Sequence, residues 1–226
     1  LNEKDMSPMK PIRFTSRDGL TIRGYLTVPK GSEGKKVPLI VNPHGGPFGV
    51  RDFWGFNPEH QFFASRGYAT VQVNYRGSGG YGRAFQQAGY GGKWGAEMQN
   101  DLTDAVKYLV DEGIVDGDKV CIYGASYGGY ATMAGLTFTP DLYKCGINYV
   151  GVTDVGLLFT SMPKHWEPQR EVMKGRIGDP EDKELMKRMS PLAHVDKIKA
   201  PLMIVQGAKD PRVVKQHATD LRDALE

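Results

Sequence analysis

The strongest chemical signal in the sequence is a glycine-rich motif around Ser126. Residues 124–128 read Gly-Ala-Ser-Tyr-Gly, follow an apolar run typical of a β-strand and precede a run typical of a helix. In that context a G-x-S-x-G motif forms a turn so sharp that only small residues fit two positions before and after the serine, which leaves the serine oxygen exposed. The alternative is a phosphate-binding loop, but no Lys-Ser or Lys-Thr follows the glycines. We therefore predict that Ser126 is a catalytic nucleophile.

Acyl transfer by such a serine needs two N–H donors for the oxyanion that develops on the substrate. One donor is the backbone amide of the residue after the nucleophile, here Tyr127. Residues 44–47 read His-Gly-Gly-Pro directly after the apolar run 38–42, which is the place of a glycine-containing oxyanion loop. We predict that Gly46 supplies the second donor. His44 precedes the nucleophile, so we interpret it as a hydrogen-bonding brace of this loop rather than as a general base.

The elements that must position these residues alternate between strand and helix patterns along the chain. Apolar runs of strand length recur between amphipathic segments, which predicts an α/β fold with a mostly parallel sheet and helices on both faces. Residues 11–29 read as a β-hairpin at the antiparallel edge of this sheet. Residues 153–199 are rich in Met, Pro and charge and are interpreted as a cap-like segment over the strand ends. We interpret residues 1–226 as a single domain.

Composition and charge narrow the class of protein. The 226 residues contain 29 Lys and Arg against 26 Asp and Glu, a net charge of +3 without a basic block, which indicates neither nucleic acid nor an anionic membrane as a partner. No apolar run approaches the roughly 18 residues of a membrane span. No metal-ligand cluster or cofactor fingerprint occurs, so we expect no cofactor. Cys121 and Cys145 lie in apolar, strand-like contexts and are interpreted as buried thiols rather than as a disulfide.

Several segments together resemble the prolyl oligopeptidase family of serine peptidases, in particular its acylaminoacyl-peptidase and dipeptidyl-aminopeptidase branch. They read NPHGGP, ASRGYATVQVNYRGSGGYG, GASYGGYA and VQGAKDPRV, and the resemblance extends from Pro11 onward. It implies an α/β-hydrolase fold and a short peptide or acyl-peptide substrate. It also implies that Asp210, in the loop after the next-to-last strand, is the acid of the catalytic triad. From the residues alone, Asp210 could instead cap a helix beside Pro211, and Asp154 is a competing acid.

The resemblance places the triad histidine on a loop after one further strand, and the sequence ends before such a loop. His217 is the only histidine after Asp210, and it falls within a helical pattern that directs it elsewhere. His60 reads as part of a surface helix, and His165 and His194 read as structural, with His165 a candidate for a substrate contact. We therefore expect a fold that is truncated at its C-terminal end, lacks the β-propeller of the family and is nearly inactive as it stands.

Three functions are compatible with these residues. The first is a serine peptidase that acts through an acyl-enzyme on Ser126. The second is a carboxylesterase, because the same serine and oxyanion loop cleave activated esters. The third is a non-catalytic binding module that uses the pocket without turnover. In each case the expected loss of the last strand would leave an open sheet edge, through which we expect dimers to form.

Overall fold

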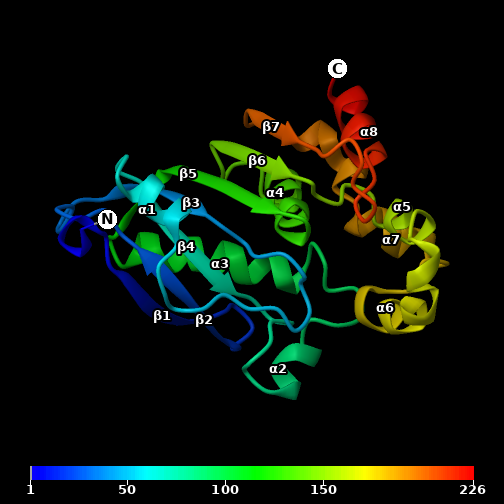
Figure 1. Ribbon diagram of the computed structural model, residues 1–226, viewed down its shortest axis with the longest axis horizontal. Coiled ribbons are helices and arrows are strands. Elements are labelled where there is room, and N and C mark those ends of the chain that lie inside the picture. The colour runs from blue at the N-terminus through cyan, green and yellow to red at the C-terminus, as the bar shows by residue number, and fades with distance from the viewer. Residues whose placement is uncertain (1) are drawn as a thin grey trace.

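A seven-stranded β-sheet with the order β1-β2-β4-β3-β5-β6-β7 forms the centre of the computed structural model, which describes residues 2–226 (Figure 1). The strands are β1 (Met9–Thr15), β2 (Thr21–Thr27), β3 (Val37–Val41), β4 (Ala69–Asn74), β5 (Val115–Ala125), β6 (Cys145–Tyr149) and β7 (Leu202–Val205). β1 pairs antiparallel with β2 and β2 antiparallel with β4, whereas the remaining neighbours pair in parallel. The predicted α/β architecture with a mostly parallel sheet is confirmed.

Helices connect the parallel strands and cover the sheet. They are α1 (Pro58–Ala64), α2 (Arg83–Gln87), α3 (Glu97–Asp111), α4 (Tyr127–Phe138), α5 (Val155–Thr160), α6 (Arg170–Ile177), α7 (Lys183–Met189) and α8 (Gln216–Leu225), with 3₁₀-helices η1 (Glu3–Asp5), η2 (Lys164–Gln169) and η3 (Pro191–Lys197). α3 and α4 contact each other and β5, while α1 packs against β2 and β4. Between β6 and β7 the chain forms the short elements α5 to η3. In Figure 1, α5, α6 and α7 lie together beyond the C-terminal ends of β5 and β6.

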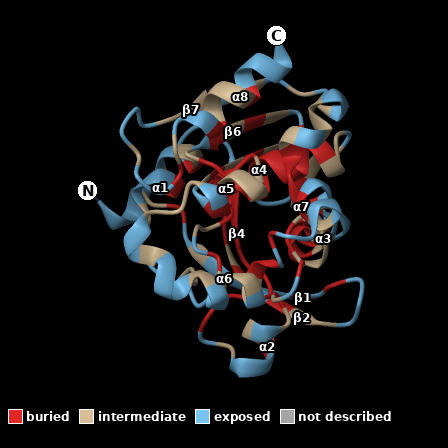
Figure 2. Ribbon diagram, turned by 90° about the vertical axis from the view of Figure 1, so that its right-hand side faces the viewer, coloured by how far each residue is buried: buried red, intermediate tan, exposed pale blue. Residues whose placement is uncertain are grey.

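β4 and α4 lie at the centre of the core. Every residue of β4 is buried, as expected for a strand that is covered on both faces. α4 is buried at almost every position because it lies between the sheet and η3. Figure 2 shows both elements in red, surrounded by helices with exposed outer faces. The segment that joins β5 to α4 therefore rests on the best-packed part of the molecule.

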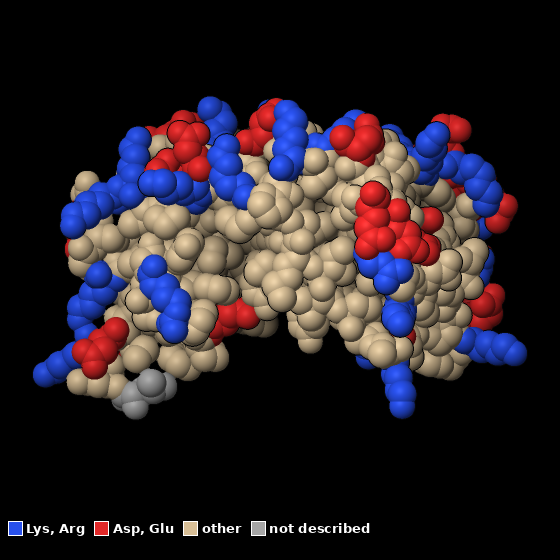
Figure 3. All heavy atoms as spheres, turned by 90° about the horizontal axis from the view of Figure 1, so that it is seen from above, with Lys and Arg blue, Asp and Glu red and all other residues tan. Residues whose placement is uncertain are grey.

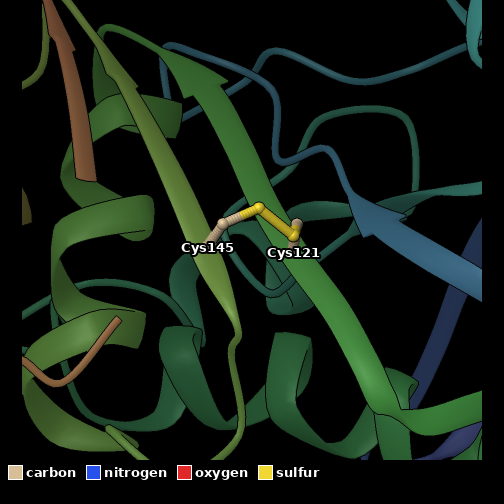
Figure 4. The surroundings of a disulfide bond; sticks show 2 residues. All are labelled: Cys121 and Cys145. Carbon is tan, nitrogen blue, oxygen red and sulfur yellow. A yellow bond between two sulfur atoms is a disulfide. The ribbon is translucent and has the colours of Figure 1, made fainter. Parts of the chain in front are cut away.

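The two cysteines form a disulfide between β5 and β6, so the expectation of buried free thiols was wrong (Figure 4). Cys121 and Cys145 are directly opposite each other in the parallel ladder, with their Cα atoms 4.8 Å apart. Both residues are half-buried rather than buried. The register that brings them together depends on how α4 returns the chain to the sheet, and the sequence contexts of the two cysteines do not reveal it.

Charged side chains of both signs are distributed over the surface. On the face shown in Figure 3, Lys and Arg are intermingled with Asp and Glu around a broad uncharged area. This distribution agrees with the near balance of 29 basic and 26 acidic residues in the sequence. Within residues 2–226, no helix is both long enough and apolar enough to cross a membrane.

A buried ion network ties the turn between β1 and β2 to the end of β4 and to α3. The Arg76 side chain is only 6% exposed, and its Nη2 lies 2.8 Å from Oδ1 of the fully buried Asp101. Its Nη1 lies 2.6 Å from Oδ2 of Asp18 in the hairpin turn. The Ser16 hydroxyl donates a second hydrogen bond to Asp101 Oδ1 at 2.9 Å. Because each buried charge has a partner, the network offsets the cost of desolvating these groups.

We expect Arg76→Met to lower the free energy of unfolding by about 3–5 kcal/mol, because it leaves the Asp101 carboxylate buried without its cationic partner. Urea denaturation followed by circular dichroism measures this loss. Lys107→Met is the matched control, since Lys107 and Asp111 form an exposed i,i+4 pair whose loss costs about 0.5 kcal/mol or less. Equal effects of the two substitutions would contradict the importance of the network.

Candidate active site

Ser126 occupies the sharp turn between β5 and α4. Its backbone has φ 58° and ψ −117°, a left-handed conformation that a residue with a Cβ adopts only under strain. Its N–H donates to Tyr149 O at 3.0 Å, and its carbonyl accepts from Tyr130 N at 3.0 Å. β6 and α4 therefore hold the turn from both sides. The Ser126 residue is exposed, as predicted for a nucleophile at the end of a strand.

Close backbone contacts explain the glycines on each side of Ser126. A Cβ on Gly124 would lie 2.5 Å from Gly128 O, and a Cβ on Gly128 would overlap the carbonyl oxygen of Pro43. A Cβ on Gly129 would lie 2.6 Å from the Cα of Gly151. These approaches are shorter than any side chain tolerates, so the turn can form only with glycine at these positions.

The loop after β3 lies directly against this turn. A Cβ on Gly45 would be 3.3 Å from Ala125 O and 3.5 Å from Ser126 Cβ. Gly46 follows with φ 114°, which favours glycine, and lines the same cavity as Ser126 and Tyr127. Within residues 2–226, the amides of Gly46 and Tyr127 have no hydrogen-bond acceptor. The structure thus brings together the serine and both predicted oxyanion donors.

His44 holds this loop in place, in agreement with the interpretation as a brace. Its Nδ1 donates to Gly45 O at 2.7 Å, and its Nε2 accepts from Ser78 Oγ at 2.9 Å. The Tyr75 hydroxyl donates to the His44 carbonyl at 2.7 Å, and the two rings stack with centroids 4.4 Å apart. Burial lowers the pKa of His44 to about 4, so the imidazole is neutral near pH 7.

Ser126 opens into a cavity of about 290 Å³ whose wall is mostly apolar and aromatic. The lining residues are Gly46, Pro47, Phe48, Trp94, Ser126, Tyr127, Val152, Leu158, Trp166, Met173, Arg176, Ile177, Arg212 and Val213. Most of them come from the loop after β3, from the segment between β6 and β7 and from the loop after β7. Trp94 was not anticipated from the sequence, where it lies in a glycine-rich stretch without periodicity, and it packs on Tyr127 with ring centroids 4.7 Å apart.

Asp210 lies in the loop after β7, as predicted, but outside the cavity that Ser126 lines. It borders a separate surface hollow that includes Tyr149 and Val150 at the end of β6. Its Oδ1 accepts the backbone N–H groups of Arg212 at 2.8 Å and Val213 at 3.0 Å, so this oxygen stabilises the loop. No donor within residues 2–226 contacts its Oδ2.

The competing acid, Asp154, caps a helix. It is the N-cap residue of α5, and its Oδ1 accepts from Leu157 N at 3.1 Å. The hydroxyl of Ser190 also lies 3.4 Å from this oxygen. This contact does not separate the two acids, because one oxygen of Asp210 likewise accepts backbone N–H groups.

Two further histidines are buried in the core. His60 of α1 is 1% exposed, and its Nε2 lies 3.1 Å from Asn42 Oδ1. The helix itself lies on the surface, as expected, but α1 turns this side chain toward the sheet. His217 of α8 is fully buried, and its Nδ1 accepts from Thr153 N at 3.3 Å. Burial lowers the pKa of both imidazoles to about 4.

The remaining histidines lie near the cavity wall or behind it. His165 is exposed in η2, with its ring 6.2 Å from that of Trp166. His194 in η3 packs against Phe138, with ring centroids 5.3 Å apart. In the part of the chain that the structure describes, no histidine lines the cavity or forms a hydrogen bond with Ser126. The structure therefore brings no imidazole from residues 2–226 to the serine.

Comparisons with known proteins agree with this geometry. Residues 54–226 match the Peptidase S9 model, which describes the prolyl oligopeptidase family. The chain is 41% identical over 236 residues to dipeptidyl aminopeptidase BIII of Pseudoxanthomonas mexicana, an alignment that covers 100% of this chain and 34% of that protein.

Two solved structures share the α/β-hydrolase fold of this chain. A puromycin-hydrolysing peptidase of Mycobacterium tuberculosis superimposes with a TM-score of 0.92 at 31% identity, covering 100% of this chain and 34% of that one. An acylaminoacyl peptidase in complex with Z-Gly-Gly-Phe-chloromethyl ketone gives a TM-score of 0.86 at 32% identity, with coverages of 97% and 35%. The chain thus spans about a third of the length of these relatives.

The backbone strain at Ser126 leads to a stability prediction. We expect Ser126→Gly to be more stable than Ser126→Ala by about 1 kcal/mol. Alanine keeps the Cβ and its strain of about 1–3 kcal/mol, whereas the greater freedom of glycine in the unfolded chain costs only about 0.5–1 kcal/mol. Urea denaturation of both variants measures the difference.

The same pair of substitutions at Ser65 is the control. Ser65 has a helical backbone with φ −63° and ψ −14°. Glycine should therefore be the less stable of the two variants there, by about 0.5–1 kcal/mol. If glycine is also the less stable variant at position 126, the turn is not strained.

Proposed function

Because the chain belongs to the prolyl oligopeptidase family of serine peptidases, we propose that it carries the catalytic part of an acylaminoacyl-peptidase-like or dipeptidyl-peptidase-like enzyme. Its substrates are short peptides, which are cleaved through an acyl-enzyme on Ser126. The observation that carries this proposal is the strained, exposed serine that shares an apolar cavity with two backbone amides without acceptors in residues 2–226. An oxyanion hole needs donors of this kind.

In the proposed mechanism, Ser126 Oγ attacks the carbonyl carbon of the scissile bond while its proton passes to an imidazole. The N–H groups of Tyr127 and Gly46 hold the oxyanion of the tetrahedral intermediate. Collapse of the intermediate breaks the C–N bond, the imidazolium protonates the leaving amine, and an ester on Ser126 remains for water to hydrolyse. Asp210 orients the imidazole through its second carboxylate oxygen.

A polypeptide of these 226 residues alone should be nearly inactive. His60 and His217 are buried, His44 is half-buried, and all three are held by hydrogen bonds, whereas His165 and His194 do not line the cavity of Ser126. Without an imidazole base, hydrolysis should fall by roughly 10⁴-fold and leave the contribution of the oxyanion hole and of binding.

Chemical rescue with free imidazole tests the function. We expect the 226-residue polypeptide to cleave acyl-amino-acid and dipeptidyl p-nitroanilides slowly, and to cleave them faster when free imidazole accepts the serine proton. Initial rates are measured with and without imidazole, alongside a p-nitrophenyl ester. Ser126→Ala at the same imidazole concentration is the control, because imidazole itself attacks activated esters.

Each outcome of this assay assigns the function. Rescue of anilide cleavage that depends on Ser126 supports the peptidase. Rescue of ester cleavage alone favours a carboxylesterase, and no dependence on Ser126 favours a non-catalytic binding module. Full activity without imidazole would mean that His217, His165 or a second copy of the chain supplies the base, which would contradict the expectation of near inactivity.

We also propose that β7 pairs with β7 of a second copy of the chain. β7 is the last strand of the sheet and pairs only with β6 among the strands of residues 2–226. Its Met203 is 59% exposed. A strand with one free edge and an apolar side chain is a template for pairing with another strand.

We expect a dimer that dissociates on dilution, and Met203→Lys should shift it to the monomer because two lysines would face each other across the new strand pair. Sedimentation velocity at several protein concentrations measures the distribution. Val172→Lys changes an apolar side chain of similar exposure, 50%, on α6 and should have no effect. A wild-type protein that stays monomeric at all tested concentrations would contradict the proposal.

A further inference from the structure

The apolar cavity beside Ser126 contains two arginines, Arg176 from α6 and Arg212 from the loop after β7. None of the described residues that line the cavity is Asp or Glu. Arg212 is exposed and lies in the same loop as Asp210, whereas Arg176 is half-buried in the cavity wall. Across residues 2–226, the guanidinium group of Arg176 forms no ion pair. A cation in a mostly apolar wall without an acidic partner from the protein is suited to an anionic group on a ligand.

The backbone around Arg176 is fixed by the loop that carries Trp94. Gly91 N donates to the carbonyl of Arg176 at 2.9 Å, and Gly92 N donates to the carbonyl of Ile177 at 2.7 Å. Both hydrogen bonds join the C-terminal end of α6 to the segment before α3. The position of Arg176 at the cavity wall is therefore set by two separate parts of the chain.

Aromatic rings also hold the side chain of Arg176. Its guanidinium carbon lies 5.5 Å from the centre of the Tyr90 ring, and Tyr90 in turn packs edge-on against Phe48 at 5.1 Å. Within residues 2–226, the Arg176 guanidinium group forms no hydrogen bond, so its N–H groups are available to a ligand. Two of them match the spacing of the two oxygens of a carboxylate.

From this arrangement we infer that Arg176 is a specificity residue that binds a carboxylate of the peptide next to the scissile bond. The inference rests on the proposed function, because the cavity is the one that Ser126 shares. Two parts of a peptide can supply the carboxylate: an acidic side chain on the residue whose carbonyl is attacked, or the C-terminal carboxylate of a short leaving fragment. A charge-assisted bidentate contact within an apolar wall should favour either substrate by about 10- to 100-fold in affinity.

Peptide binding to Ser126→Ala tests the inference without requiring turnover. The peptides are acetyl-Ala-Glu-Ala-amide, acetyl-Ala-Gln-Ala-amide and acetyl-Ala-Gln-Ala with a free carboxylate. Titration calorimetry gives the affinities, and quenching of Trp94 and Trp166 reports binding in the cavity. We expect one of the two peptides with a carboxylate to bind about 10- to 100-fold more tightly than the neutral peptide. Which one does so identifies the source of the carboxylate.

Substitution of Arg176 in the same background separates recognition from packing. Arg176→Gln should weaken binding of the preferred carboxylate peptide about 10- to 100-fold more than binding of the neutral peptide, and Arg176→Lys should keep part of the preference as a point charge. The matched control is Arg66→Gln, since Arg66 also lies over a ring, that of Phe62, but not at the cavity. Arg66→Gln should leave all three affinities unchanged.

The inference is overturned if the three peptides bind equally or not at all to Ser126→Ala. It is also overturned if Arg176→Gln weakens the neutral and acidic peptides to the same extent, because Arg176 would then act only through packing. The imidazole-rescued anilide assay with intact Ser126 reports separately on the proposed function. A failure of recognition is therefore distinguishable from a failure of catalysis.

Discussion

The candidate site depends on a single backbone constraint, the left-handed conformation of Ser126 at the end of β5. This conformation is unfavourable for a residue with a Cβ, so contacts with neighbouring residues must stabilise it. The hydrogen bond from Ser126 N to β6 and the one from Tyr130 N to the Ser126 carbonyl do so from both sides. α4 belongs to the most deeply buried part of the chain, and a well-packed core does not relax easily around a strained residue.

The same constraint determines where the oxyanion loop lies. Because Gly128 has no Cβ, Pro43 approaches the first turn of α4 directly, and Gly45 comes to rest against Ser126. An aromatic series then joins the loop to the helix: the ring of Tyr75 stacks on His44 and lies 5.4 Å from that of Tyr127. The neutral His44 suits this role, since a charged imidazole beneath the loop would have to be desolvated without a counterion. The two proposed donors are thus positioned by packing before any substrate arrives, which is what electrostatic stabilisation of an oxyanion requires.

The parts of this arrangement that could be predicted from the sequence are those with a local signature. The turn at Ser126 could be predicted because the glycines keep a fixed, local spacing around the serine between a strand pattern and a helix pattern, and the strands because they are apolar runs of the right length. The disulfide between Cys121 and Cys145 could not, since it depends on the register of two strands separated by a helix. The burial of His60 depends on which face of a short helix meets the sheet, and a seven-residue helix has too few turns to reveal that face. Arg176 has no local signature at all, because its environment is made by residues from other loops.

The loop after β7 shows how closely the chemistry and the shape of the site are linked. Asp210 is the candidate acid, yet one of its oxygens holds the amides of Arg212 and Val213, and these two residues form part of the cavity wall next to Ser126. In the proposed mechanism the carboxylate has two tasks, one for each oxygen: Oδ1 holds the loop that lines the cavity, and Oδ2 would orient an imidazole. Removing the side chain would disturb both tasks together, whereas asparagine can keep the Oδ1 acceptor and change only the charge. The role of this residue in catalysis can thus be separated from its role in the shape of the cavity only by a substitution that preserves the two backbone hydrogen bonds.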